Sequence, residues 1–468
     1  MTGQMNSPKT AQDRPAEYTI IGAGPAGMAA AIRLSQAGKR VTLIDLAASP
    51  GGQIYRQLAQ PGPAAHLLGK DYLRGKDLIA RFLAAPITYL PNHRVFWLEQ
   101  QPTGFQLGVR SQGATRTLTT EKLIIATGAM ERPMPFRGWQ LPGVMSAGAA
   151  QILIKQSGLI PDRAPVLAGT GPLLYLLAYQ LLKAGQPPLA VLDMAPRGAF
   201  LQPFKTPKRS WHGRNYLTKG VVLMAALRLA GVKLINGVSG LEAVGKSQLS
   251  GVQYRRNNHL HSLPCQSLLV HTGVVPEPQT ARALGVQYHW HDSQLAFLPA
   301  RDRDNFTVAD KLWMIGDCAS IQGAINAEME GTLVAQQVLD EDTKTVQKNL
   351  YRRAKENAIR PLLEAMFRPP ERWLVQQPDN TLICRCEAVS LGQLKQAMAD
   401  GARTADQLKT FTRCGMGACQ GRMCALAVSA LLAEQHQRSP DAAGYFRIRT
   451  PITPITLAEL GDLHRVKN

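Results

Sequence analysis

Cysteines and acidic residues are both scarce in this chain of 468 residues. Its seven cysteines are too few for a disulfide scaffold at this length, and a chain this long can bury a core without one. Its 33 Asp and Glu residues are outnumbered by 53 Lys and Arg residues, which gives a formal net charge of +20. This excess predicts affinity for an acidic partner subunit, an anionic membrane face, nucleotide phosphates or, without specificity, nucleic acid, and does not choose among them.

Targeting and membrane-spanning signals are also missing. The first residues contain no apolar segment of the kind that a secretory signal needs. The stretch 164–182 is uncharged over 19 residues, which is the length of a membrane span, but its glycines and prolines favour a strand, a turn and a helix. We therefore predict a cytoplasmic protein without a transmembrane segment. A peripheral position at the inner face of the membrane is compatible with this prediction.

Signatures of hydrolytic chemistry and of specific nucleic-acid binding are absent too. The ten histidines show no HExxH spacing, and no Ser/His/Asp set stands out. The segment 205–219 mixes basic and aromatic residues, which superficially suits a single-stranded nucleic acid. No RNA-binding motif accompanies it, so we interpret it as a solvated basic loop or a subunit contact, and predict no specific nucleic-acid partner.

The chain does contain a glycine-rich turn of the GxGxxG type near its start. Gly22 permits a tight turn, Gly24 lets the backbone approach a pyrophosphate, and Gly27 lets helix and strand pack closely. The free N–H groups of the following helix would face the phosphates. Asp45 stands 23 residues after Gly22, where a carboxylate can accept both ribose hydroxyls of an adenosine. This pattern predicts a dinucleotide site, with strands over 18–21 and 40–44 and a helix over 28–37 that ends at Gly38.

A weaker copy of this unit follows. It has a predicted strand over 165–168, a turn over 169–172 and an acidic residue, Asp193, 24 residues after Gly169. Leu174 replaces the third glycine, so we expect the helix to be pushed from the strand and the phosphate pocket to be altered. An adenine nucleotide, ATP or NAD, remains a tentative prediction here, whereas a working NAD(P)H site is less favoured. The contacts expected for it are Gly169, Gly171, Pro172 and Asp193.

Two later motifs distinguish FAD from NAD as the ligand of the first unit. Gly51-Gly52-Gln53 follows Asp45 closely, and Gly316-Asp317 precedes a helix that we expect to begin near Gly323. A flavin needs a carboxylate for its ribitol hydroxyls and a helix N-terminus near its pyrimidine ring. Asp317 and this helix meet both needs, although Asp317 alone could equally cap a helix.

Five of the seven cysteines gather in one short C-terminal stretch. Thiolates this close repel one another unless a cation holds them, and sites of four thiolates bind zinc or iron–sulfur. A structural zinc usually prefers Cys-x2–4-Cys, and Cys-x-Cys is tight for that, so a [2Fe–2S] cluster is favoured over zinc. Helices capped by Ser390 and Thr404, and another starting near Gln420, could turn their N-termini toward the cluster. The predicted ligands are Cys384, Cys386, Cys414 and Cys419, with Cys424 as an alternative.

Over about residues 17–340 the chain resembles the two-dinucleotide-domain flavoproteins that include glutathione-reductase-like enzymes. GAGPAGMAAA with Asp45, ATGAMERP, the second GTGP turn and IGDCASIQGA carry this resemblance. Neither nucleotide unit contains a Cys-x-x-Cys or Cys-x4-Cys pair, so Cys265 and Cys318 are expected to be core thiols and a disulfide reductase is excluded. The resemblance implies FAD on the first unit, in contact with Gly22, Gly24, Pro25, Ala26, Gly27, Asp45, Gly52, Gln53, Val95 (a loose match), Ala126, Thr127, Gly128, Gly316, Asp317, Gly323 and Ala324.

The cysteine-rich stretch resembles the bacterioferritin-associated-ferredoxin-like [2Fe–2S] domain. Its combination with a flavoprotein resembles the FAD-bearing subunit of heteromeric opine, D-hydroxyproline and related amino-acid dehydrogenases. The hydrogen cyanide synthase flavoprotein and the sarcosine oxidase α chain are more distant. GGQIYRQ, ERPMPFRGWQLPGVMSAGAAQ, TRCGMGACQGRMC and RTPITPITLAEL match the first group.

This second resemblance implies a division of labour between subunits. A partner flavoprotein would oxidise the amino or imino acid. Electrons would pass through this chain, which carries no catalytic residue for the substrate, to a quinone or another acceptor. Further expectations are an FMN at a subunit interface and a small ferredoxin-like partner. Two other functions stay open: a self-sufficient NAD(P)H-dependent reductase, and a non-catalytic nucleotide- and metal-binding assembly subunit.

The predicted fold class is therefore α/β, with two Rossmann-like dinucleotide-binding domains, the first discontinuous, and a small, mainly helical iron–sulfur domain. Pro369-Pro370 is taken as a domain boundary. The predicted boundaries are an unstructured N-terminus over 1–16, the FAD domain over 17–155 and 275–342, the second nucleotide domain over 156–274, a helical linker over 343–372, the [2Fe–2S] domain over 373–436 and a tail over 437–468.

Overall fold

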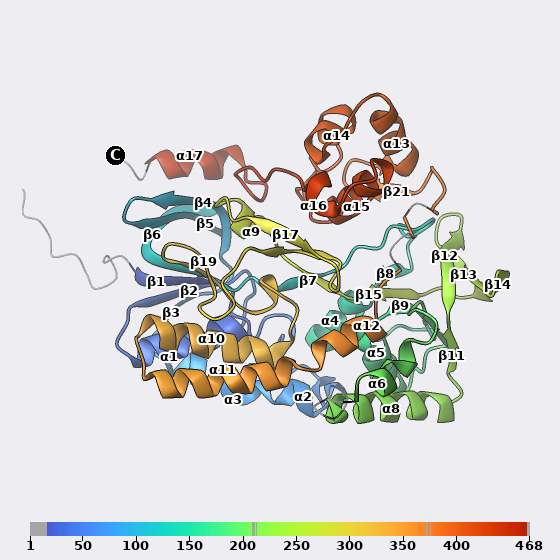
Figure 1. Ribbon diagram of the computed structural model, residues 1–468, viewed down its shortest axis with the longest axis horizontal. Helices are drawn as coiled ribbons and strands as arrows, with labels where there is room; N and C mark the ends of the chain where they lie inside the picture. The colour runs from blue at the N-terminus through green and yellow to red at the C-terminus, as the bar shows by residue number, and fades with distance from the viewer. Residues whose placement is uncertain (1–15, 208–210, 212, 371–372, 375, 466–468) are drawn as a thin grey trace, which may run out of the picture.

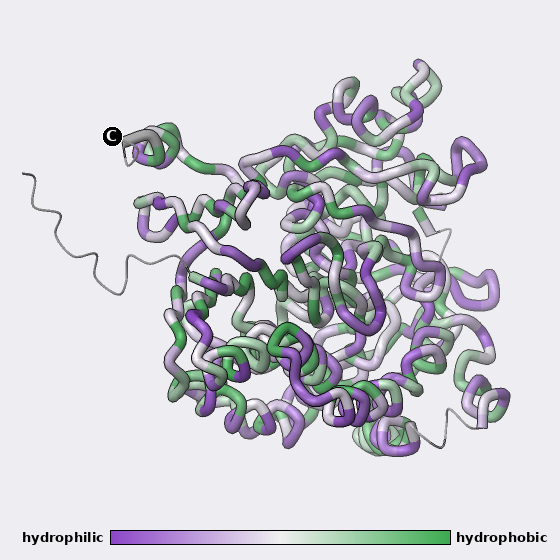
Figure 2. Tube along the Cα trace, turned by 60° about the vertical axis from the view of Figure 1, so that its left-hand side comes forward, coloured by the Kyte–Doolittle hydropathy of each residue, from purple (hydrophilic) through white to green (hydrophobic). Residues whose placement is uncertain are grey.

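The computed structural model describes residues 16–465, apart from 208–210, 212, 371–372 and 375. The predicted unstructured segment 1–16 lies outside the described residues, except for Ala16, which opens the first strand. Two α/β units lie side by side, and the helices that follow residue 390 sit above them (Figure 1). Apolar residues occur mainly in the strands and inner helices, and polar ones along the outer turns (Figure 2). The predicted fold class is confirmed.

The first unit contains the following elements, in chain order. They are β1 (Ala16–Ile21), α1 (Pro25–Gln36), β2 (Val41–Ile44), η2 (Ala65–Leu68), α2 (Lys70–Leu73), α3 (Gly75–Ala84), β3 (Thr88–Leu90), β4 (Arg94–Gln101), β5 (Gly104–Ser111), β6 (Ala114–Ile125) and β7 (Ala129–Glu131). After the second unit come β16 (Val274–Pro276), α9 (Gln279–Arg282), β17 (Tyr288–His291), β18 (Ala296–Pro299), β19 (Thr307–Ala309), β20 (Leu312–Met314), η4 (Gly316–Cys318) and α10 (Ala324–Val338).

The sheet of the first unit has eight strands in the order β19-β20-β6-β1-β2-β3, with β4 and β5 joined to β6. β1 pairs in parallel with both β2 and β6, and β20 pairs in parallel with β6. Ile21 stands beside Ile44 and Ile125, so the turns after these three strands meet at one edge of the sheet. Open α/β sheets bind ligands at this edge.

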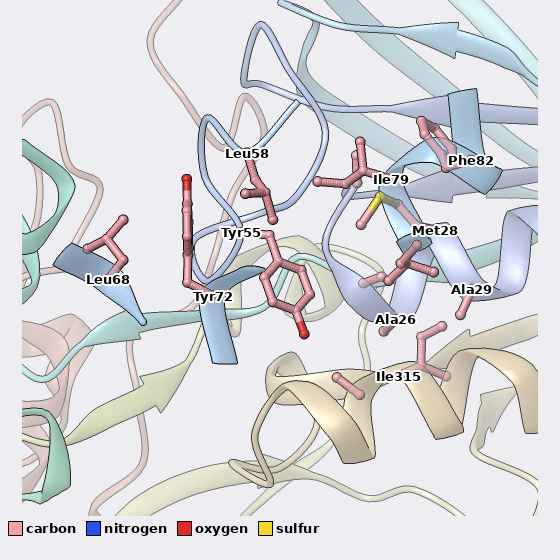
Figure 3. Packing of buried hydrophobic residues seen from close by; sticks show 14 of the residues in the cluster. Ala26, Met28, Ala29, Tyr55, Leu58, Leu68, Tyr72, Ile79, Phe82 and Ile315 are labelled. Atoms are coloured by element: carbon pink, nitrogen blue, oxygen red, sulfur yellow. The ribbon is translucent and has the colours of Figure 1, made fainter. Parts of the chain in front are cut away.

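α1 and α10 pack closely against each other beside this sheet. A Cβ added to Gly331 on α10 would lie 2.1 Å from the carbonyl oxygen of Ala26 on α1, so only glycine allows this approach. Tyr55, which follows the Gly51-Gly52-Gln53 turn, is 2% exposed and packs among Leu58, Tyr72 and neighbouring apolar residues (Figure 3). The Gly51-Gly52-Gln53 turn is therefore anchored to the core directly behind it.

The second unit contains another set of elements. They are β8 (Val144–Ser146), α4 (Ala147–Ser157), β9 (Val166–Thr170), α5 (Pro172–Lys183), β10 (Ala190–Asp193), η3 (Ala199–Leu201), α6 (Gln202–Lys205), α8 (Arg214–Leu229), β11 (Lys233–Asn236), β12 (Val238–Gly245), β13 (Leu249–Arg256), β14 (His259–Pro264) and β15 (Leu268–Thr272). Five of its strands form a parallel sheet in the order β11-β10-β9-β15-β8.

One predicted boundary is wrong. β8 pairs with β15, and α4 packs on α5 and β15, so both belong to the second unit although they begin before residue 156. Sheet pairing between distant segments cannot be seen in a local pattern. The uncharged stretch 164–182 forms β9 and most of α5, as predicted. In the described part of the chain, no helix combines the length and the apolar run that crossing a bilayer requires.

The C-terminal part begins with α11 and α12 and continues into a module around the cysteines. Its elements are α11 (Thr343–Asn357), α12 (Arg360–Met366), β21 (Leu382–Cys384), β22 (Val389–Ser390), α13 (Leu391–Ala399), α14 (Ala405–Thr412), α15 (Ala425–Gln435), α16 (Pro440–Ala443) and α17 (Leu457–Arg465). Ser390 and Thr404 form capping boxes at the starts of α13 and α14, as predicted. The helix expected near Gln420 begins at Ala425 instead, because Gln420 has a left-handed φ of 52°.

The segment predicted as a tail over 437–468 takes part in both cores. Ala443 and Phe446 are buried in the core of the cysteine module. Farther on, α17 lies on β6 of the first unit, where the backbone oxygen of Glu459 accepts a hydrogen bond from Thr115 at 2.7 Å. This segment therefore ties the module back onto the first unit, across the top of Figure 1.

Candidate flavin and thiol sites

One cavity of about 930 Å³ opens where the two nucleotide units and the cysteine module meet. Fifteen of the sixteen residues expected to contact FAD line it, Gly27 being the exception. The second unit contributes Gly171, Pro172 and His271, and the cysteine module contributes Ala418, Cys419 and Arg422. The residues that sequence motifs predicted separately are thus brought around a single space.

Two glycines of the first turn, Gly24 and Gly27, have different tasks. A Cβ on Gly27 would lie 1.9 Å from the carbonyl oxygen of Gly22, so Gly27 permits the close packing of α1 on the turn and does not face the cavity. A Cβ on Gly24 would meet nothing within 4 Å, and Gly24 lines the cavity. Gly24 is also the N-cap of α1, and no side chain caps this helix. The turn therefore fits a phosphate ligand, which needs open space above uncapped N–H groups.

Two carboxylates, those of Asp45 and Asp317, line the cavity. Asp45 accepts hydrogen bonds from the backbone N–H groups of Ala47, at 2.6 Å, and of Ala23. Asp317 accepts from the N–H groups of Gln322, at 2.9 Å, and Gly323, at 3.0 Å, and so fixes the turn that leads into α10. Burial raises the pKa of both carboxyl groups, and these backbone donors oppose the rise. Both residues line the cavity, as ribose and ribitol contacts require.

The second unit does not offer its acidic residue in the same way. Asp193 is 1% exposed and does not line the cavity. Its carboxylate accepts hydrogen bonds from the hydroxyl of Tyr175 and from the N–H of Ala195, at 2.8 Å. In this structure the carboxylate is enclosed by the protein and does not reach the cavity, where the ribose contact was expected. Gly169 is likewise a packing position: its Cβ would lie 1.7 Å from the carbonyl oxygen of His271.

Two buried cations that the motifs did not reveal line the cavity. Arg132 donates hydrogen bonds to three backbone carbonyls, those of Thr272, Gln294 and Leu295, and burial lowers its pKa to about 10. Lys155 on α4 donates to the carbonyls of the glycine-rich turn that carries Gln53, and burial lowers its pKa to about 8. Arg132 and Lys155 reach the cavity only because the two units meet there. Their spacing in the sequence therefore does not reveal them.

Glu330 is a third residue without a sequence signal. It is 1% exposed on α10, and its carboxylate accepts from Arg301, Arg353 and the N–H of Gly316. Burial raises its pKa, but the two guanidinium groups and the Gly316 N–H outweigh burial and hold the pKa below its ordinary value. Its arginine partners stand 29 and 23 residues away, so no local pattern connects them.

The five C-terminal thiols converge in two groups. The Sγ atoms of Cys384, Cys414 and Cys424 lie within 4.8 Å of one another and are buried. Cys386 and Cys419 are hydrogen-bonding neighbours of each other at the module surface. S–H donors from Cys414 and Cys424 lower the pKa of Cys384 well below its ordinary value. Cys424 is also the N-cap of α15. The geometry gives no reason to leave Cys424 out of the ligand set, although the sequence spacing favours the other four.

Comparison with known proteins decides the family. Residues 16–331 match the family described as "Pyridine nucleotide-disulphide oxidoreductase". The chain belongs to the pyridine nucleotide-disulphide oxidoreductase family. This membership makes it an oxidoreductase and supports FAD as the cofactor of the first unit. Residues 379–462 match a second family, described as "Sarcosine oxidase A3 domain".

This oxidoreductase is similar to several subunits of larger enzymes. An opine oxidase subunit of Agrobacterium tumefaciens (strain Ach5) is 39% identical, over 96% of this chain and 92% of that protein. Hydrogen cyanide synthase subunit HcnB of Pseudomonas aeruginosa is 30% identical, over 95% of this chain and 98% of that protein. The crystal structure of L-proline dehydrogenase from P. horikoshii has the same fold, with a TM-score of 0.71 at 17% identity, and covers 96% of this chain and 79% of that one. The resemblances to the opine oxidase subunits, the hydrogen cyanide synthase flavoprotein and the sarcosine oxidase α chain are confirmed.

The disulphide chemistry in the family's description has no counterpart in the two nucleotide units of this oxidoreductase. Cys265 and Cys318 are both buried and free, as predicted, and they belong to separate hydrophobic clusters. Burial raises the pKa of each thiol to about 11. Neither is a reactive thiol.

Proposed function

We propose that this chain holds FAD in the shared cavity and a [2Fe–2S] cluster on its C-terminal cysteines, and transfers electrons between them. It would do so as one component of a heteromeric dehydrogenase in which a partner flavoprotein oxidises an amino or imino acid of the opine or proline type. The acceptor would be a quinone or another carrier. One observation carries this proposal: Cys419, one of the five C-terminal cysteines, lines the same cavity as Gly24, Asp45 and Asp317.

The residues of the cavity suit FAD in a definite order. Gly24 and the uncapped start of α1 would bind the pyrophosphate, and Asp45 would accept the hydroxyls of the adenosine ribose. Asp317 would accept ribitol hydroxyls, and the N-terminus of α10 would favour negative charge on the pyrimidine ring. Bound FAD supplies a two-electron store that can exchange electrons singly. Lys155 would hold the Gln53 turn against it.

Contacts between the module and the first unit keep the thiols at the cavity. Arg422 forms an ion pair with Glu277 at 3.4 Å, and its Nη1 donates to the carbonyl of Ile452 at 3.1 Å. Gln279 on α9 donates to the carbonyl of Gln420 at 2.5 Å. Gln420 and Arg422 stand one and three residues after Cys419, so these bonds fix its loop against the cavity. A relay between two redox groups needs this kind of fixed proximity.

The cluster would be held by four of the five thiols. The three buried sulfur atoms of Cys384, Cys414 and Cys424 suit three ligand positions, and the neighbouring pair Cys386 and Cys419 would supply the fourth. Four thiolates are the donor set of a [2Fe–2S] centre. Zinc remains the competing occupant, since it accepts the same donors.

The identity of the partner rests on the relatives. Proteins similar to this chain are subunits of opine oxidases and of hydrogen cyanide synthases, whose names denote multi-subunit enzymes. We propose the same assembly here, on the cytoplasmic side, with the net charge of +20 favouring an acidic partner surface. The enclosed Asp193 argues against a self-sufficient NAD(P)H-dependent reductase, because its carboxylate is already bonded to Tyr175 and does not reach the cavity.

Separating the subunits tests this proposal. The isolated chain should be yellow-brown and should oxidise no amino acid, whereas addition of its co-purifying partner should restore dye-linked oxidation of an opine or proline-type substrate. Rapid amino-acid oxidation by the isolated chain would contradict the proposed division of labour. Rapid bleaching of its flavin by NADH or NADPH would support the reductase in its place.

A further inference from the structure

Glu131 and His271 form a buried pair where the two nucleotide units meet. Glu131 ends β7 and His271 lies on β15; the Nδ1 atom of His271 and Oε1 of Glu131 are 2.6 Å apart. The carboxylate of Glu131 also accepts the N–H of Gly148, at 2.9 and 3.1 Å to its two oxygens. Gly148 stands in the first turn of α4, where backbone N–H groups favour an anion. Glu131 is thus anchored as a carboxylate beside the imidazole.

Of these two residues, His271 lines the cavity. His271 is 3% exposed and lines the cavity together with Gly171 and Pro172. Its Nδ1 faces Glu131, and a Cβ placed on Gly171 would lie 3.0 Å from Nε2, so Nε2 is directed at the Gly171 turn. Among the described residues Nε2 has no hydrogen-bond partner. With the proton of the neutral ring on Nδ1, as the bond to Glu131 requires, Nε2 carries the free lone pair and can act as a base.

Charged groups on several neighbouring elements face His271. The negative charge of Glu131, at the end of β7, favours the imidazolium form of His271. The positive charge of Arg132 opposes it, because Arg132 is bonded to the carbonyl of Thr272, the residue next to His271. α4 brings the cation Lys155, which is bonded to the Gln53 turn. The end of β9 and the start of α5 face His271 with Gly169, Gly171 and Pro172, which have no titratable side chain. Tyr175 of α5 is bonded to Asp193.

We propose that His271, held by Glu131, accepts and returns the proton that accompanies oxidation and reduction of the flavin in this cavity. This proposal rests on the proposed function. A reduced flavin holds two electrons and at least one proton, whereas a [2Fe–2S] cluster takes electrons singly and needs no proton. When two such one-electron steps oxidise the flavin, an N–H bond of the reduced ring breaks and an N–H bond forms at Nε2. The Glu131 carboxylate then stabilises the imidazolium until its proton leaves to solvent, which balances atoms and charge.

The test uses the holoprotein with its flavin reduced anaerobically and then mixed with ferricenium, a one-electron oxidant that carries no proton. In His271→Asn the amide can still donate to Glu131 but cannot accept a proton. We expect its flavin oxidation to be slower by a factor of about 10² to 10⁴, the usual contribution of acid–base catalysis, at unchanged FAD content. His93→Asn is the matched control, since Nδ1 of His93 bonds the carbonyl of Pro91 instead of a carboxylate.

Further readouts separate a proton carrier from a merely structural residue. In His271→Ala, added imidazole should restore the rate, and the wild type should be slower in D₂O, whereas His271→Asn should have lost its pH dependence. A His271→Asn rate and pH profile equal to those of the wild type would overturn the proposal. If His271→Asn loses FAD, the proposal is tested instead by the rate of flavin oxidation in Glu131→Gln and by the solvent isotope effect of the wild type. An unchanged rate in Glu131→Gln together with no isotope effect in the wild type would overturn the proposal. A wild-type chain that binds no FAD would instead refute the proposed function.

Discussion

Arg301 holds Glu330 through two parallel hydrogen bonds, Nη1 to Oε2 at 2.9 Å and Nη2 to Oε1 at 3.2 Å. The same carboxylate receives the N–H of Gly316 at 2.8 Å, one residue before Asp317. A buried ion pair thus stands directly behind the turn that presents the expected ribitol contact. Loss of this pair should disturb both the fold and the turn.

Glu330→Gln should destabilise the chain strongly, because it leaves two guanidinium groups buried without their carboxylate. Removing one partner of a buried pair typically costs about 3–5 kcal/mol. The free energy of unfolding in urea measures this loss. Glu328→Gln, on the same helix but facing Arg81 at 3.6 Å in a more exposed pair, should cost less than about 1 kcal/mol. Equal effects of the two substitutions would contradict the role of Glu330.

The same pair should make stability depend on pH. The pKa of Glu330 is lower in the folded chain than its ordinary value of 4.5, so its ionised form is favoured by folding. The stabilisation is complete above about pH 4.5 and is lost as the pH falls through the lower, folded value. The difference in melting temperature between wild type and Glu330→Gln should therefore shrink below pH 4.5. A difference that grows on acidification would show the opposite sign.

Gly27→Ala and Gly24→Ala should separate folding from cofactor binding. The methyl group on Gly27 would collide with the carbonyl oxygen of Gly22, so we expect a loss of about 1–3 kcal/mol in unfolding free energy. The methyl group on Gly24 meets no protein atom within 4 Å but enters the cavity, so stability of the apoprotein should hold while FAD affinity falls by about tenfold or more. Unfolding curves and flavin fluorescence titrations measure the two effects. The reverse pattern would contradict the assignment.

The cysteines can be sorted by their effect on iron content. Cys384→Ser, Cys414→Ser and Cys424→Ser should each abolish the cluster, because their sulfur atoms share one buried site. Cys265→Ser, in a separate apolar cluster, should keep the full iron content and is the control. Iron analysis and electron paramagnetic resonance of the reduced protein provide the readout. Full iron in Cys424→Ser would return the ligand set to Cys384, Cys386, Cys414 and Cys419.

Asp45 and Asp193 occupy matching places in the two units but should behave differently. Asp45→Asn should weaken FAD binding while the fold persists, since Asp45 lines the cavity. Asp193→Asn should lower stability without changing FAD affinity, since Asp193 serves Tyr175 and Ala195 in the interior. Calorimetric titration with FAD and thermal unfolding distinguish these results. Loss of FAD affinity in Asp193→Asn alone would invert the roles of the two units.

Much of the cavity could be predicted because its glycines and Asp45 and Asp317 follow buried strands in fixed order, and parallel strands bring their ends together. The closed state of Asp193 could not be predicted, because it depends on Tyr175 reaching across from the helix. Lys155, Glu330 and the pair Glu131–His271 were missed for the same reason: their partners are distant in sequence. Cys424 was set aside on spacing alone, whereas the fold brings its sulfur beside Cys384 and Cys414.

The central claim is that FAD and a [2Fe–2S] cluster occupy this one chain and exchange electrons. The most direct measurement is a reductive titration of the anaerobically purified chain, followed by absorption and by electron paramagnetic resonance, with flavin and iron determined on the same sample. We predict one FAD and two iron atoms per chain, and a reduced-cluster signal that appears while the flavin band bleaches. A colourless chain that contains zinc and no iron, or a cluster that stays oxidised when the flavin is fully reduced, would contradict the account.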